Sequence, residues 1–358
     1  MSDCKQFYNN ICKEINRRER DKLKDFETIF SVKQGSENKN VKLTEVQKFA
    51  ANFYKAPIIN YKGHVTDKSK VNNTRYSEVI ADTLVSKGYI KTWLELQPLR
   101  PNHFDTGHNH SESVDINKLQ ISNRKEEILA KLLFYQREVK DLGYIFDYQT
   151  PLKKVQSDPY GKIDLLGYNS KDKCYSIIEL KYRPSGSEET LLRCVLEAYT
   201  YYKLFDLNQI ESAQDHKGIN ELRALNDYKH TKNAELVILF DEKSRTKEDD
   251  GENSNLMLRI NLQNKDKANK VNKEIYPSKT VESQQHKECQ ELLDSDKRNS
   301  LRTLCKTILE QEPNLKQIRF VVLRVDSNSK KNHLEYITGW DENLDRFYRA
   351  ETLLTISK

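Results

Sequence analysis

The sequence predicts an α/β fold that is preceded by a mostly helical N-terminal domain. Over residues 121–241, segments with the apolar period of a helix alternate with short apolar segments typical of strands. A further apolar segment at 318–325 predicts another strand of the same sheet. A chain of 358 residues has room for two domains. We place them at 1–120 and 121–358, the second with a polar insertion at about 242–315.

The segment 77–90 is the most informative part of the N-terminal domain. Lys87-Gly88 is a helix stop, because glycine readily takes the left-handed conformation that ends a helix. A helix that runs into Lys-Gly-Tyr-Ile resembles the helix-to-wing junction of winged-helix modules. Three interpretations are open for this domain: a DNA-reading winged-helix module, a sensor, and a plain helical packing module. The helix would pack through one apolar face, formed by Val79, Ile80, Leu84 and Val85.

Residues 124–140 predict an amphipathic helix, and residues 143–146 predict the strand after it. At about 100° per residue, Glu126 lies nearer the edge of the apolar face than Glu127 does. The apolar side chains recur at helical spacing: Ile128, Leu129, Leu132, Leu133, Tyr135 and Val139.

Residues 162–168 and 175–181 predict a β-hairpin, because both are rich in Ile, Leu and Tyr and a polar loop lies between them. If its turn is centred on Lys171-Asp172, Asp164 faces Glu179 across the two strands. Side chains alternate between the faces of a strand, so Lys181 shares the face of Glu179. Two carboxylates and an ammonium are therefore expected to converge on one patch. The same register opposes Leu166 to Ile177 and Tyr168 to Tyr175.

This patch has the chemistry of a divalent-metal site. Two neighbouring carboxylates repel each other unless a cation lies between them. Hard oxygen ligands suit Mg²⁺ or Mn²⁺, which keep water and bind phosphate oxygens, and a bound metal can lower the pKa of its water. A nearby lysine can orient that water or add positive charge. The alternative is a salt-bridge triad on a solvated strand face, but here the charges interrupt apolar strands.

Asp164 followed by Glu179-Leu180-Lys181 resembles the PD-(D/E)xK nuclease superfamily, whose core runs helix, three strands, helix, strand. The resemblance covers about residues 121–241 and implies a restriction-endonuclease-like core, a mixed sheet flanked by helices. It implies that Asp164 and Glu179 ligate the metal and are catalytic together with Lys181, and that the Leu180 carbonyl is a further ligand. The proline that the superfamily has just before the aspartate is missing here.

The resemblance also extends to the two flanking helices. A third acidic residue of the superfamily would correspond to Glu126, for which an acidic first turn stabilised by the helix dipole is the alternative. Residues 188–205 predict the second helix, followed by a buried strand at 234–240. Some members carry Gln-x-x-x-Tyr in this helix, and the chain has Glu197-x-x-x-Tyr201, a partial match. Candidate nucleic-acid contacts are Arg193, Tyr201 and Lys162, although Arg193 and Glu197 also suit an i,i+4 surface ion pair.

The function implied by the resemblance is a metal-dependent nuclease, acting on DNA in bacterial restriction or anti-phage defence, with Mg²⁺ or Mn²⁺ as cofactor. Two-strand cleavage usually needs two active sites, so a homodimer is also considered. Two alternatives remain open. One is a catalytically inactive nucleic-acid-binding or assembly module on the same fold. The other is a nuclease gated by a ligand, RNA-cleaving enzymes included, with a sensor in residues 1–120 or 242–315.

Composition agrees with these expectations. The formal net charge of +6 fits a polyanionic partner without demanding one. The six cysteines include no C-x-x-C pair, which favours reduced thiols in the cytosol. No apolar signal region or spanning segment is present, so we expect a cytoplasmic protein without a membrane partner.

The loop at 101–110 holds His103, His108 and His110. A zinc site and a polar, substrate-facing loop are both open interpretations, because no pair of these histidines has a familiar helix spacing and no cysteine contributes.

Overall fold

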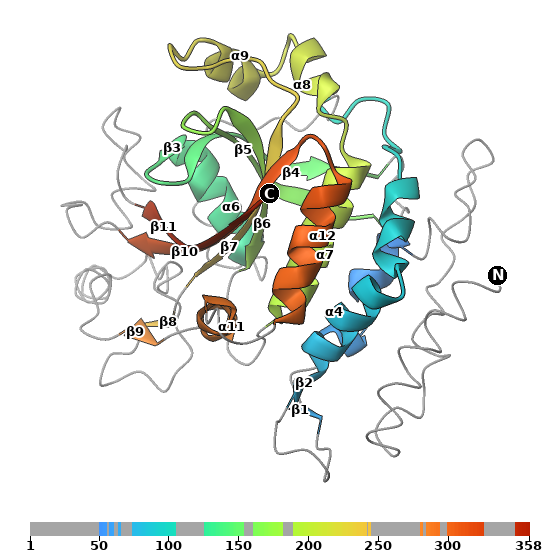
Figure 1. Ribbon diagram of the computed structural model, residues 1–358. Coiled ribbons are helices and arrows are strands. Elements are labelled where there is room, and N and C mark those ends of the chain that lie inside the picture. The colour runs from blue at the N-terminus through green and yellow to red at the C-terminus, as the bar shows by residue number, and fades with distance from the viewer. Residues whose placement is uncertain are drawn as a thin grey trace.

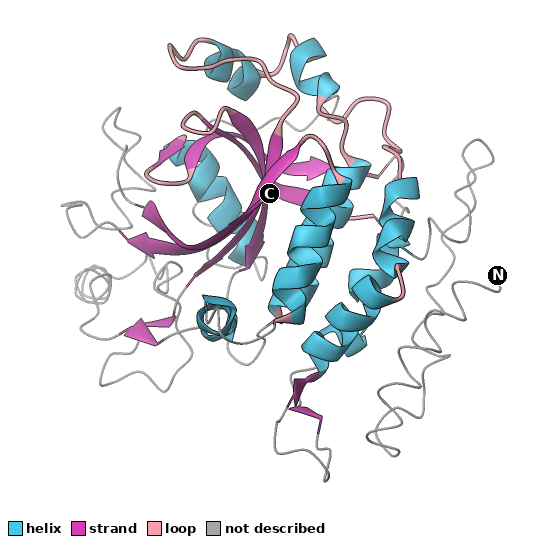
Figure 2. Ribbon diagram, in the orientation of Figure 1, coloured by secondary structure: helices cyan, strands magenta, loops and turns pink. Residues whose placement is uncertain are grey.

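A mixed seven-stranded sheet with helices on both faces organises the chain, which confirms the prediction of an α/β fold (Figures 1 and 2). The structure is a computed structural model. It describes residues 50–55, 57–60, 64–65, 74–104, 125–153, 160–181, 189–241, 243–244, 280–281, 284–293, 299–325 and 348–358.

The sheet combines parallel and antiparallel pairs. From one edge to the other it contains β11 (Tyr348–Ser357), β10 (Leu315–Val325), β7 (Ala234–Asp241), β6 (Cys174–Lys181), β5 (Lys162–Asn169), β4 (Gly143–Pro151) and β3 (Glu138–Val139). β6, β7 and β10 run parallel, and the remaining neighbours are antiparallel. The sheet curls, because Lys140, just after β3, forms a bridge with Arg349 at the opposite edge. Two small ribbons pair β1 (His64–Val65) with β2 (Thr74–Arg75), and β8 (Lys243–Ser244) with β9 (Thr280–Val281).

Helices cover the two faces unequally. α6 (Lys125–Gln136) packs on one face, whereas α7 (Leu191–Leu204) and α12 (Ser300–Gln311) pack on the other, with α4 (Tyr76–Ser86) against α12 (Figure 1). The shorter helices are α8 (Asn208–Ser212), α9 (Lys217–Arg223) and α11 (Gln284–Leu293), and the 3-10 helices are η1 (Phe53–Lys55), η2 (Pro57–Asn60) and η3 (Tyr89–Glu95).

Strand alternation divides the core between the two faces. Leu165 and Ile178 pack with α6, whereas their neighbours Leu166 and Ile177 pack with α7. All four are fully buried. Each such side chain stabilises the fold by about 1.5–3 kcal/mol relative to an exposed one. The strands are therefore apolar on both faces, and a charged residue within them needs a specific explanation.

The helix expected at 124–140 is shorter than predicted. It ends at Gln136, because Arg137 takes a left-handed backbone with a φ of 63°. Glu138 and Val139 then form β3 beside β4. The prediction that Val139 belongs to the helix was wrong, although its side chain is buried in the same core as that of Leu132. An apolar residue that follows the end of a helix can still pack into the same hydrophobic core as the helix.

The expected winged-helix junction is not formed. Gly88 has a φ of 70° and ends the helix as predicted, but the following residues form η3 instead of a strand. The described N-terminal residues are also not a separate packing unit, because Phe53, Ile80 and Trp93 lie in the core that contains α7. Trp93 Nε1 donates a hydrogen bond to Thr200 Oγ1 in α7 at 2.9 Å.

The remaining strand and helix predictions hold with shifted ends. β5, β6, β7 and β10 match the expected strands, and α7 begins at Leu191 because Thr190 caps it. The neighbour of β10 in the sheet is β11, which the sequence did not reveal. None of the described helices is long and apolar enough to cross a membrane.

Candidate active site

The hairpin of β5 and β6 has the register that the sequence predicted. Leu166 is paired with Ile177 and Tyr168 with Tyr175, and the turn occupies residues 170–173. Glu179 and Lys181 share the strand face of Ile177, which packs against α7, and Lys181 acts on the pKa of both Asp164 and Glu179. The expected convergence of Asp164, Glu179 and Lys181 is therefore present.

The two strands separate at this point. Their described pairing ends at Leu165 and Ile178, although β5 continues along β4 to Lys162 and β6 continues along β7 to Lys181. The carboxylate of Asp164 projects into this gap. Its Oδ2 accepts a hydrogen bond from the Leu180 backbone N–H at 2.9 Å. A side-chain acceptor thus replaces a strand partner, and the carboxylate is held in place.

Gln149 supports the other oxygen of Asp164. Its side-chain amide donates to Oδ1 at 3.0 Å. Gln149 has a φ of 54°, in the left-handed region that glutamine rarely adopts. Unusual backbone conformations of this kind cluster at functional sites.

Lys181 lies among three carboxylates. Its ammonium contacts Glu179 on the same strand, and it is 2.8 Å from Glu197 Oε2 and 2.9 Å from Glu189 Oε2. Burial alone would lower the pKa of Lys181, but these carboxylates outweigh burial and raise it well above its usual value. The side chain therefore stays charged and is unsuited to accept a proton.

The strand carboxylates resist ionisation. Burial raises the pKa of Asp164 well above its usual value, and the charge of Glu126 raises it further. Burial likewise raises the pKa of Glu179, with Glu197 as the next cause. Glu197 behaves differently: burial opposes its ionisation, but Lys181 and Arg193 prevail and lower its pKa. Lys181 acts on the pKa of all three carboxyl groups, and Glu197 has the charge of Arg193 beside it as well.

One oxygen of Glu179 is left over. Glu179 is 2% exposed, and its Oε2 accepts no hydrogen bond from the described residues, although a hydrogen bond shared with Glu179 helps to lower the pKa of Glu197. Once Glu179 is ionised, a buried oxygen without a donor is costly. Glu235, an equally buried carboxylate of β7, shows the usual alternative, because Arg319 donates to both of its oxygens at 2.6 and 2.9 Å. The orphaned oxygen of Glu179 is what a cation would satisfy.

The donor set suits Mg²⁺ or Mn²⁺. Carboxyl groups outnumber cationic groups around the cluster: Glu126, Asp164, Glu179, Glu189 and Glu197 against Lys55, Lys181 and Arg193. Within the described ranges, however, no three acidic, histidine or cysteine side chains gather as a ready metal centre. Mg²⁺ is commonly held by one or two carboxylates, with water and phosphate at the other positions, so the pair Asp164 and Glu179 fits it.

The two further predicted ligands, Glu126 and Leu180, lie beside this pair. Glu126 is half-buried in the first turn of α6 and acts on the pKa of Asp164 second only to burial, whereas Glu127 acts on Tyr148. The N–H and C=O of one strand residue point the same way. Because the Leu180 N–H points at Asp164, the Leu180 carbonyl faces the gap between β5 and β6.

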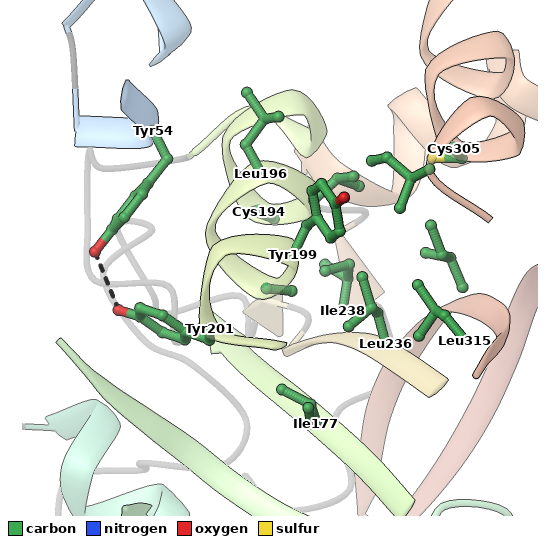
Figure 3. Packing of buried hydrophobic residues seen from close by; sticks show 14 of the residues in the cluster. Tyr54, Ile177, Cys194, Leu196, Tyr199, Tyr201, Leu236, Ile238, Cys305 and Leu315 are labelled. Carbon is green, nitrogen blue, oxygen red and sulfur yellow. Dashed lines mark hydrogen bonds between the residues drawn. The ribbon is translucent and has the colours of Figure 1, made fainter. Parts of the chain in front are cut away.

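The predicted nucleic-acid contacts have different outcomes. Tyr201 is buried, its hydroxyl donates to Glu197 Oε1 at 3.0 Å, and Tyr54 is bound behind it at 3.3 Å (Figure 3). It positions Glu197, and its contact with nucleic acid stays a prediction. Arg193 pairs with Glu189 at 2.9 Å and with Glu197 at 3.8 Å, so the i,i+4 ion pair is present. Lys162 is partly exposed on the same strand face as Asp164.

Sequence reasoning missed Glu189, Gln149 and Tyr54. Glu189 had a signal, since it continues the four-residue spacing of Arg193, Glu197 and Tyr201 along one helical ridge. Nothing in the local sequence marks Tyr54, because it reaches the site from a distant segment.

The histidine loop is structural at its described end. His103 is fully buried, its Nδ1 lies 2.9 Å from the Pro151 carbonyl, and its Nε2 accepts the Asp206 N–H at 3.2 Å. Both ring nitrogens are engaged, so His103 is not a zinc ligand here. His108 and His110 lie outside the described residues.

Comparisons with protein-family models, curated proteins and solved structures give no match to this chain.

Proposed function

We propose that this protein is a metal-dependent nuclease that hydrolyses phosphodiester bonds, with DNA as the first candidate substrate. One observation carries the proposal: Asp164 and Glu179 converge in a gap between two strands, beside the ammonium of Lys181, and a buried oxygen of Glu179 accepts no hydrogen bond from the described residues. The proposal includes a restriction-endonuclease-like core. In support, α6, β4, β5, β6, α7 and β7 follow the order helix, three strands, helix, strand, with the two-residue β3 before β4 and the short α8 and α9 before β7 as additions.

Each residue of the site would have a distinct role in hydrolysis. Asp164 and Glu179 would hold Mg²⁺ or Mn²⁺, with the Leu180 carbonyl and Glu126 as further donors. Such a cation, when bound, supplies a water of lowered pKa and neutralises charge on the phosphate. Lys181 would orient the attacking water or stabilise negative charge that develops on the phosphate. Lys162 would contact the phosphate backbone beside the site.

Cleavage assays on the full-length protein test this proposal directly. Single-stranded DNA, double-stranded DNA and RNA should each be incubated with Mg²⁺, Mn²⁺ and EDTA. We expect cleavage that needs the divalent metal and falls by about 10²-fold or more in Asp164→Asn, Glu179→Gln and Lys181→Met. Lys171→Met, at the exposed turn of the same hairpin, is the matched control and should cleave normally. An Asp164→Asn protein with wild-type activity would rule out the assignment.

A second candidate is a nucleic-acid-binding or assembly module without catalysis. One observation favours it: the ammonium of Lys181 already balances Glu179, and no ready metal centre exists among the described side chains. Nucleic-acid binding that weakens with salt, with no cleavage under any divalent metal, would support this candidate over the first.

A further inference from the structure

Lys181 lies between carboxylates of two different elements. Glu179 belongs to β6, beside Asp164 of β5, whereas Glu197 belongs to α7 and Glu189 lies two residues before that helix begins. The Lys181 Nζ contacts Glu179 and lies 2.9 Å from Glu189 Oε2 and 2.8 Å from Glu197 Oε2. One ammonium is therefore shared between a strand carboxylate and two helix-side carboxylates.

The helix-side carboxylates are held in place independently of Lys181. Tyr201 donates to Glu197 Oε1 at 3.0 Å, and Arg193 Nε lies 2.9 Å from Glu189 Oε1. Each carboxylate thus presents its second oxygen, Oε2, to the ammonium. The two form a cradle for Lys181 that does not depend on Glu179.

The strand side is incomplete by comparison. Glu179 Oε2 is buried and accepts no hydrogen bond in the described part of the chain, and the hydrogen-bond donors to Asp164 there are neutral, the Leu180 N–H and the Gln149 amide. A cation at these two carboxylates would repel the ammonium of Lys181, because like charges at close range in a buried site repel strongly. The helix-side cradle gives the ammonium a place to remain.

We propose that Lys181 is the internal counter-ion of Glu179 in the metal-free protein, and that Glu189 and Glu197 are positioning residues that hold its ammonium once Asp164 and Glu179 bind a divalent cation. This inference rests on the function proposed above, because it takes those two carboxylates as the ligands. Its consequence is that Glu197 controls metal affinity without touching the metal. When Glu197 is neutral, the ammonium stays on Glu179 and competes with the cation.

A double-mutant cycle on Mn²⁺ binding can separate an effect of Glu197 that acts through Lys181 from a general effect of its negative charge. The full-length wild type, Glu197→Gln, Lys181→Gln and the double variant should be titrated with Mn²⁺ by calorimetry. Glutamine keeps the size of Glu197 and can still accept the Tyr201 hydrogen bond. We expect Glu197→Gln to weaken Mn²⁺ binding by about tenfold when Lys181 is present. In the Lys181→Gln background the same change should have less than about a twofold effect.

Equal weakening in both backgrounds would overturn the inference, because it would mean that Glu197 acts only through its negative charge. Cooperative thermal unfolding verifies that each variant is folded, and Glu189→Gln replaces Glu197→Gln in the cycle if the latter is not. If the wild-type protein does not bind Mn²⁺, or if Asp164→Asn leaves Mn²⁺ binding intact, the proposed function and the inference both fail. If Mn²⁺ binding depends on Asp164 but the effects of Glu197→Gln and Lys181→Gln simply add, the inference alone fails.

Discussion

The backbone N–H of Leu180 donates a hydrogen bond to the carboxylate of Asp164 at 2.9 Å, at the point where the pairing of β5 and β6 ends. Asp164 is therefore both a link between two strands and a candidate metal ligand. An amide oxygen can accept the same hydrogen bond but is a weaker ligand for a hard cation, so the two roles can be separated by experiment.

We predict that Asp164→Asn folds as stably as the wild type without metal but no longer gains stability from it. A cation that binds only the folded state stabilises it by about 2.7 kcal/mol at a hundred times its Kd. Thermal melting with and without Mn²⁺ measures this effect. The wild-type melting temperature should rise and that of Asp164→Asn should not. An equal rise in both proteins would place the metal elsewhere.

Tyr201 should stabilise the site through Glu197. Because Tyr201 donates its proton to Glu197, Tyr54 must be the donor in the 3.3 Å contact behind it. Tyr201→Phe removes a donor to a buried carboxylate, which costs about 1.5–3 kcal/mol. Urea unfolding should show this loss, and metal-dependent cleavage should fall as well. Tyr54→Phe should have a smaller effect, because it removes a hydrogen bond between neutral groups.

The matched control for this pair is Tyr202→Phe, at the next position of the same helix on a half-buried face. Its stability should stay within about 0.5 kcal/mol of the wild type. If Tyr201→Phe were as mild as Tyr202→Phe, the hydroxyl of Tyr201 would have no role in holding Glu197.

Residues 121–358 alone should fail to fold. Phe53, Ile80 and Trp93 are fully buried in the core that includes α7, and their removal would expose that surface. We predict no cooperative thermal transition for this fragment by circular dichroism, in contrast to the full-length chain. A fragment that melts cooperatively would show that the N-terminal residues are dispensable for folding, and would support the prediction of a separate domain.

His103 should make the protein less stable in mild acid. Its Nε2 accepts the Asp206 N–H, so the ring is neutral. Burial lowers its pKa below the ordinary 6.5, Arg100 lowers it further, and the Pro151 carbonyl and Asp206 oppose this shift. Below pH 6.5 the unfolded chain takes up a proton that the folded protein refuses, so stability falls as pH drops, by up to about 1.4 kcal/mol per pH unit.

Urea unfolding at pH 7.5 and 5.5 measures this loss. His103→Asn should lose less stability between the two values than the wild type, whereas His230→Asn, at a more exposed histidine, should behave like the wild type. An unchanged pH dependence in His103→Asn would mean that other groups cause the acid sensitivity.

The sequence was sufficient for the strands and for the register of the hairpin, because strand alternation and turn position are local properties of the chain. Once Leu166 was opposed to Ile177, the common face of Asp164, Glu179 and Lys181 followed. The end of α6 was missed because Val139 fits the helical period. Val139 is buried as part of strand β3, which begins after the left-handed residue Arg137.

Only the tertiary structure decided what surrounds Lys181. Its neighbours Glu189 and Glu197 belong to an element that packs across the sheet face, and Tyr54 reaches Glu197 through Tyr201 from a segment that no local pattern connects to the site. The amphipathic face of α4 predicted burial but not its partner, because an apolar stripe packs equally well against its own domain or another. Local periodicity therefore determined which side chains face inward, and long-range packing determined which of them meet.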